Sequence, residues 1–172
     1  MLHVRPPVFS FFRIQLIVSL FMINSRQLNS SRTSMAYPFK PGLNQILEYA
    51  RKEGLICAVA SSSPREMIEY LLERNGLASF FSVVQSGEEA PHGKPAPDVF
   101  LMACEKAGVQ PETALVMEDS ESGILAAHRA GIPSIWIPDL IEIDKEVQAL
   151  AWHICQSLSE VPELLEKNTA RD

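Results

Sequence analysis

The first residues that could handle an anionic group are Ser61 and Ser62, which follow the apolar run LICAVA. Hydroxyls and free backbone N–H groups at the start of a helix suit an anionic oxygen. The alternative interpretation is that these serines only cap the next helix. On its own, this segment leaves both interpretations open.

A second candidate is Lys94, which stands between Gly93 and Pro95 in the loop SGEEAPHGKPAP. A lysine on a stiff loop can direct its ammonium group at a phosphoryl group or at a carboxylate nucleophile. The alternative is an ordinary surface lysine. The loop is not a P-loop, because Gly87 and Gly93 enclose five residues rather than four and Pro95 replaces the Ser or Thr that binds magnesium.

The third candidate is the acidic pair Glu118 and Asp119, which follows the apolar run ALVM. Two adjacent carboxylates repel each other unless a cation lies near them, and hard oxygen ligands of this kind suit Mg²⁺. The alternative is an acidic helix start favoured by the helix dipole. Ser120 lies at the same point and would support such a site.

The elements around these residues alternate regularly from Pro41 onward. Helical spacing places apolar residues on one stripe after Pro41, and continuous apolar runs of strand length follow each helix. This alternation predicts an α/β fold with a parallel sheet and helices on both faces, in which ligands bind beyond the carboxyl ends of the strands. The expected strands are residues 55–60, 80–84, 114–117 and 134–137, and the expected helices include residues 98–107, with Phe100, Leu101 and Cys104 facing inward, and residues 120–130.

Composition narrows the classes of function. The 172 residues suit one domain, and the net charge of −6 argues against non-specific binding of nucleic acid. The three cysteines are far apart and odd in number, which is typical of buried thiols in a reducing compartment rather than of a disulfide framework or a zinc site.

Taken together, the phrases AVASSS, GKPAPDVF and MEDSESGILAAHRAG resemble the haloacid dehalogenase (HAD) superfamily, in the branch of β-phosphoglucomutase and phosphoglycolate phosphatase. The resemblance covers about residues 41–166 and implies a three-layer, Rossmann-like α/β/α core. It implies that Ser61, Ser62 and Lys94 bind phosphate, with Lys94 and Ser61 in the catalytic machinery. It also implies that Glu118 and Asp119 hold Mg²⁺ and that the partner is a small phosphorylated metabolite.

One departure from the family pattern is large. The family's first motif, DxDGT, provides the aspartate nucleophile and a general acid/base, but no Asp precedes Ser61 here and no two Asp residues are spaced as DxD. The helical cap that follows this motif is also missing. We therefore expect a truncated phosphatase or phosphomutase with little or no turnover, or alternatively a non-catalytic module that binds phosphate and Mg²⁺. A complementing N-terminal fragment or a second copy of the chain would be a further partner.

Residues 1–36 differ from the rest, because they contain four Arg and no acidic residue. We interpret them as an N-terminal extension, targeting-like or unstructured, before an incomplete core domain at residues 37–172. This makes the protein cytoplasmic or, if the extension is a targeting segment, organellar. Its apolar stretch is too short to span a membrane. Residues 14–23 are also the only run that could fill the central strand position left by the missing motif, which would place Asn24 near the nucleophile position.

Overall fold

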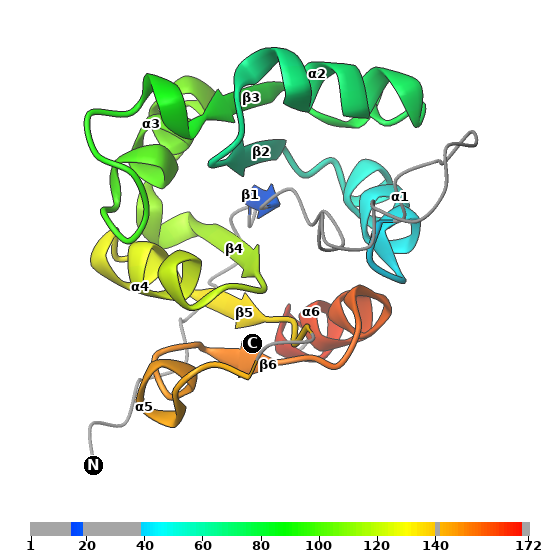
Figure 1. Ribbon diagram of the computed structural model, residues 1–172. Helices are drawn as coiled ribbons and strands as arrows, with labels where there is room; N and C mark the ends of the chain where they lie inside the picture. The colour runs from blue at the N-terminus through cyan, green and yellow to red at the C-terminus, as the bar shows by residue number, and fades with distance from the viewer. Residues whose placement is uncertain (1–14, 19–38, 140–141, 170–172) are drawn as a thin grey trace, which may run out of the picture.

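The computed structural model describes residues 15–18, 39–139 and 142–169 (Figure 1). Its strands are β1 (Gln15–Val18), β2 (Cys57–Ser61), β3 (Val83–Ser86), β4 (Ala114–Glu118), β5 (Ser134–Trp136) and β6 (His153–Ile154). Its α-helices are α1 (Leu43–Glu53), α2 (Arg65–Arg74), α3 (Asp98–Ala107), α4 (Glu121–Arg129), α5 (Lys145–Gln148) and α6 (Val161–Thr169).

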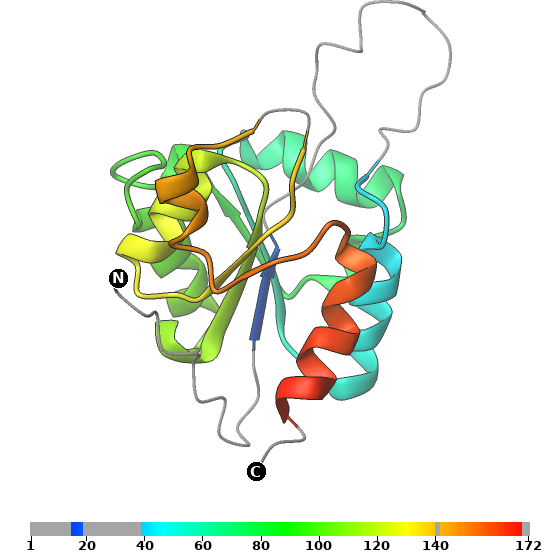
Figure 2. The same ribbon diagram turned by 90° about the horizontal axis from the view of Figure 1, so that it is seen from below.

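The strands form one parallel sheet in the order β3-β2-β1-β4-β5-β6. Helices cover both faces, with α1 and α6 on one side and α3 and α4 on the other (Figure 2). Alternate residues of β4 enter opposite cores: Leu115 and Met117 pack with α1 and α6, whereas Val116 packs with α3 and α4. This two-sided burial explains the continuous apolar runs and confirms the predicted three-layer α/β/α fold.

Helix α1 illustrates how local sequence sets the elements. Its buried residues follow the helical spacing predicted after Pro41, and they are Leu43, Ile46, Leu47 and Ala50. Gly54 ends the helix in the left-handed conformation, with φ of 65°, and its N–H donates to the carbonyl groups of Ala50 and Arg51. The helix is therefore fixed at its C-terminal end by the only residue type that adopts this conformation without strain.

The central position of the sheet is occupied by β1. Val18 is paired with Val59 of β2 on one side and with Met117 of β4 on the other, both in parallel. The hypothesis that residues 14–23 fill this gap is thus confirmed for Gln15–Val18. Asn24 and the rest of residues 1–36 lie outside the described residues, so the domain boundary at residue 36 stays a prediction.

Two local predictions were wrong. Residues 80–84 were expected to be a strand, but Ala78–Phe80 form a 3₁₀ turn and the strand begins only at Val83. The aromatic residues Phe80 and Phe81 have a strand-like composition. Instead, their side chains pack, from this turn and the residue after it, against the hydrophobic core on the α1 side of the sheet. Leu101 was expected to face inward, but it is 38% exposed, since the buried face of α3 runs through Val99, Phe100 and Cys104.

Candidate active site

The candidate residues lie at the carboxyl edge of the sheet. Ser61 is the last residue of β2 and Glu118 the last of β4, with β1 between these two strands. Neighbouring strands lie about 4.8 Å apart, so the two strand ends are roughly 10 Å apart.

Lys94 and Glu118 form a dry ion pair. The Lys94 Nζ atom lies 2.7 Å from Glu118 Oε2, and the two side chains are only 6% and 2% exposed. The ammonium group also lies 4.6 Å from the centre of the Phe100 ring, a cation–π distance. Burying either charge alone would be costly. The two buried side chains are tolerated here because each neutralises the charge of the other.

The loop that carries Lys94 is held at both ends. His92 Nδ1 lies 3.0 Å from Asp98 Oδ1, and Arg129 donates a hydrogen bond of 2.8 Å to the Pro95 carbonyl oxygen. These contacts tie the loop to the start of α3 and to α4. They support the prediction that the loop aims its lysine.

The second oxygen of Glu118 is also engaged. Oε1 accepts hydrogen bonds from the backbone N–H groups of Asp119 (3.1 Å) and Ser120 (3.2 Å) and from the Ser120 hydroxyl (3.0 Å). Ser120 in turn caps α4, because its hydroxyl oxygen accepts from the Gly123 N–H. Gly123 is required here, since a Cβ at this position would lie 2.0 Å from the Glu118 carboxyl carbon.

Asp119 faces a different environment from its neighbour. Burial and the nearby negative charge of Glu118 raise its pKa to about 6, while the Lys40 ammonium opposes the shift. Its Oδ2 atom lies 3.5 Å from Lys40 Nζ, and its side chain is 20% exposed. Asp119 is therefore the more accessible carboxylate of the acidic pair.

Lys40 and Asp139 were missed by the sequence analysis. Lys40 Nζ lies 3.4 Å from Asp139 Oδ2 and donates a hydrogen bond of 3.2 Å to the Pro138 carbonyl oxygen, and its side chain is only 7% exposed. Asp139 could have been found by the rule that found Asp119, because it follows closely after β5. Lys40 carried no such signal, since it precedes a helix rather than following a strand.

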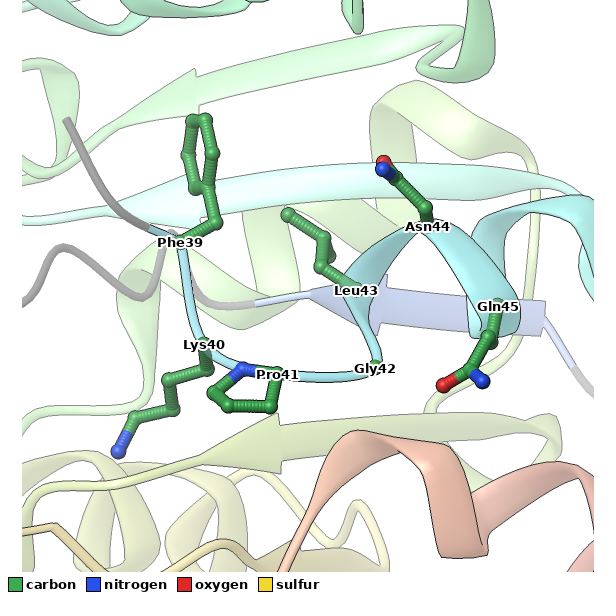
Figure 3. Close-up of a pocket in the computed structure, with 7 residues that line it drawn as sticks. All are labelled: Phe39, Lys40, Pro41, Gly42, Leu43, Asn44 and Gln45. Atoms are coloured by element: carbon green, nitrogen blue, oxygen red, sulfur yellow. The ribbon is translucent and has the colours of Figure 1, made fainter. Parts of the chain in front are cut away.

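A cavity of about 360 Å³ lies at the start of α1 (Figure 3). Its lining is one continuous segment, residues 39–45. Lys40 and Phe39 point to opposite sides of this segment (Figure 3). The Lys40 side chain thus connects this segment to Asp119 and Asp139.

The serines after β2 form the other side of the site. Ser61 is buried, and its hydroxyl oxygen accepts a hydrogen bond of 3.2 Å from the Ser63 N–H, so its proton can still be donated. Ser62 is exposed, and its backbone is tightly approached by Gly87, where a Cβ would lie 3.0 Å from Ser62 Cα. Ser61 acts both as a turn residue and as an available donor, so the two interpretations of this segment are compatible.

The carboxylates fit a Mg²⁺ ion unequally. Both oxygens of Glu118 are already bound by donors from the chain itself, whereas Asp119 presents a partly exposed oxygen. Hard carboxylate oxygens are the ligands Mg²⁺ prefers. Within residues 15–18, 39–139 and 142–169, no cluster of three or more His, Cys, Asp or Glu side chains is placed to hold a metal ion. Of the two predicted ligands, Asp119 therefore has the more accessible carboxylate, and the assignment of Glu118 and Asp119 to Mg²⁺ stays a prediction.

Comparison with known protein families shows to which of them the chain belongs. The family described as "Haloacid dehalogenase-like hydrolase" matches residues 14–137. The chain belongs to this family. The match begins with β1, in agreement with the place of that strand at the centre of the sheet.

Two curated phosphatases of this family are similar in sequence. Hexitol phosphatase B of Escherichia coli (strain K12) is 36% identical over 101 residues, which are 59% of this chain and 46% of that protein. The phosphorylated carbohydrates phosphatase of Thermotoga maritima is 36% identical over 96 residues, 56% of this chain and 44% of that protein. The matched part of the chain thus spans less than half the length of these relatives.

Solved structures show the same core. A putative β-phosphoglucomutase from Thermotoga maritima matches with a TM-score of 0.67 and 30% identity, covering 74% of this chain and 59% of that one. CbbY from Rhodobacter sphaeroides, solved in complex with phosphate, matches with a TM-score of 0.63 and 28% identity, covering 71% and 55%. These neighbours support placement in the β-phosphoglucomutase-like branch. No α-helix within the described part of the chain has the length and apolar character needed to cross a bilayer.

Proposed function

We propose that this chain binds the phosphoryl group of a small phosphorylated carbohydrate and turns it over slowly or not at all. The phosphoryl group would sit at the carboxyl ends of β2 and β4, as expected for a phosphatase or phosphomutase of this family. The observation that carries the proposal is the buried Lys94–Glu118 pair at the sheet edge where β2 ends in Ser61, in a chain whose first acidic residue is Glu48. The names of the similar phosphatases support a phosphorylated carbohydrate as the ligand class.

Each residue has a distinct task in this proposal. The Lys94 ammonium, fixed by Glu118, stabilises negative charge on the phosphoryl oxygens. Ser61 donates its hydroxyl proton to one of those oxygens, and Ser62 offers an exposed hydroxyl beside it. Mg²⁺ held at Asp119 would neutralise further phosphoryl charge when bound.

The lack of turnover follows from the residues near β1. Covalent catalysis in this family needs an aspartate after the central strand, which becomes an acyl-phosphate. β1 occupies that central position, and neither it nor the sequence on to Leu47 contains Asp or Glu. No other residue type in that segment can form an acyl-phosphate, because an amide or hydroxyl oxygen is not a carboxylate nucleophile.

A second candidate function is a non-catalytic module that binds phosphate and Mg²⁺ and acts through a partner. The same absence of an early carboxylate favours it. The two candidates differ in their response to an added N-terminal fragment carrying DxDGT. A dormant enzyme gains activity if the strand of the fragment can replace β1 between β2 and β4, whereas a binding module gains none.

The test is release of inorganic phosphate from a panel of hexitol phosphates, sugar phosphates and phosphoglycolate, with Mg²⁺ present. Asp119→Ala is assayed in parallel. We expect little or no release above that variant, together with measurable binding of inorganic phosphate by calorimetry. Rapid release that disappears in Asp119→Ala would show efficient catalysis without the usual nucleophile and refute the proposal.

A further inference from the structure

Lys40 places a positive charge where the acidic end of the site is most accessible. Two carboxylates and a carbonyl oxygen converge on its Nζ atom: Asp119 at 3.5 Å, Asp139 at 3.4 Å and Pro138 O at 3.2 Å. The Lys40 side chain is 7% exposed, whereas the side chains of Asp119 and Asp139 are 20% and 28% exposed. The ammonium group thus lies beneath two carboxylates that remain open to solvent.

The backbone of Lys40 is fixed at the start of α1. The Leu43 N–H donates to the Lys40 carbonyl oxygen at 3.3 Å, and Gly42 lies so close to the chain at residues 158–159 that a Cβ would be 2.1 Å from Ser159 N. The fixed backbone, together with the burial of the Lys40 side chain, holds the ammonium group near Asp119 and Asp139. The ion pairs are therefore part of the fold rather than chance surface contacts.

A divalent ion bound by the Asp119 carboxylate would lie close to the Lys40 ammonium group. Mg²⁺ requires ligand oxygens at about 2.1 Å in near-octahedral geometry. An ammonium group 3.5 Å from Asp119 Oδ2 repels such an ion at short range and already neutralises part of the carboxylate charge. The two cations cannot use this oxygen fully at the same time.

We propose that Lys40 is a built-in counter-ion of the site that competes with Mg²⁺ for the negative charge of Asp119 and so weakens the binding of a divalent ion. This inference rests on the proposed function, because it concerns the metal position of the same phosphoryl site. It goes further by assigning a role to Lys40 and Asp139. It also predicts weak binding of Mg²⁺ to the native chain.

Calorimetric titration of Mg²⁺ into the full chain tests this competition. Lys40→Met keeps the aliphatic stem and removes the charge, and we expect it to bind Mg²⁺ about tenfold or more tightly than the native chain. Lys52→Met removes a 78% exposed lysine of α1 and is expected to leave the affinity unchanged. Adding Asp119→Asn to Lys40→Met should abolish the gain. Equal Mg²⁺ affinity in the native chain and Lys40→Met would overturn the inference.

A second measurement needs only the native fold and decides the question if Lys40→Met does not fold. Lysine acetylation read by mass spectrometry should label Lys40 slowly relative to Lys52, and Mg²⁺ should raise the labelling of Lys40 alone. Labelling of Lys40 that stays constant while Mg²⁺ saturates its site would overturn the competition. Binding of inorganic phosphate is read separately: its absence would refute the proposed function, while the Mg²⁺ comparison would still decide the role of Lys40.

Discussion

Glu118 and Asp119 are adjacent in sequence, yet each faces a different lysine in a different environment. Glu118 is 2% exposed, is paired with Lys94 at 2.7 Å and has both oxygens bound. Asp119 is 20% exposed and shares Lys40 with Asp139 at longer distances.

This difference indicates that Glu118 and Asp119, although adjacent in sequence, have separate roles. The Lys94–Glu118 half is closed, so its charges are compensated and fixed. The Lys40–Asp119 half is partly open, so its charges can exchange partners with solvent ions. We interpret the first half as the phosphoryl-binding support and the second half as the exchangeable cation position.

The largest effect on the free energy of unfolding is expected from breaking the buried Lys94–Glu118 ion pair. Lys94→Met leaves the Glu118 carboxylate buried without its charge partner, and we expect a loss of about 3–5 kcal/mol in the free energy of unfolding. Urea denaturation measures this loss. The double variant Lys94→Met with Glu118→Gln should recover most of it, because the glutamine carbonyl can still accept the hydrogen bonds at the α4 start. A loss below about 1 kcal/mol in the single variant would place this pair with ordinary surface ion pairs.

The next effect comes from crowding Glu118 against α4. In Gly123→Ala the added Cβ meets the Glu118 side chain at 2.0 Å, and we expect a cost of about 1–3 kcal/mol as the carboxylate is displaced. Thermal unfolding measures it. Gly93→Ala is the matched control, since nothing lies within 4 Å of a Cβ there and its effect should be small.

Titration of Asp119 should make the free energy of unfolding depend on pH. Its pKa is raised from 3.8 to about 6, so between about pH 4 and pH 6 the folded chain keeps a proton that the unfolded chain has lost. The contribution of this group to the free energy of unfolding therefore falls as pH rises through that window. Denaturation at several pH values should show this slope in the native chain and a weaker slope in Asp119→Asn. A slope equal in both would contradict the assignment.

The smallest effect is expected at an exposed network away from the site. Arg65 pairs with Glu69 and Glu89 and donates to the Val84 carbonyl oxygen at 2.8 Å, but it is 37% exposed. Arg65→Ala should cost about 0.2–1 kcal/mol, less at high salt. Hydrogen bonds from Arg65 and Lys106 lower the pKa of Glu89 to about 2, so the pairing is present above the ordinary carboxyl range and is lost as pH falls toward 2. A cost similar to that of Lys94→Met would remove the contrast between buried and exposed pairs.

The sequence predicted most of the fold because its signals are local. The stripe of α1, the span of α3 and the central position of β1 followed from apolar spacing and run length. The 3₁₀ turn at Ala78–Phe80 did not, since aromatic residues that favour strands also pack well from a turn.

The site was only partly predictable for a related reason. Lys94 and the acidic pair stand in recognisable sequence motifs, but the ion pair between Lys94 and Glu118 was not among the predictions. The contact of Lys40 with Asp119 joins residues far apart in the sequence, and only the packing of α1 beside the sheet brings them together. Ser61 and Ser62 lie at the predicted strand end, and their role toward phosphate stays a prediction.

The central claim is that this chain keeps a phosphoryl-binding site built on Lys94, and it is tested most directly by calorimetric titration of inorganic phosphate. The native chain is compared with the folded double variant Lys94→Met with Glu118→Gln. We predict saturable binding to the native chain and its loss in the double variant. Equal binding to both, or no binding to the native chain, would contradict the claim.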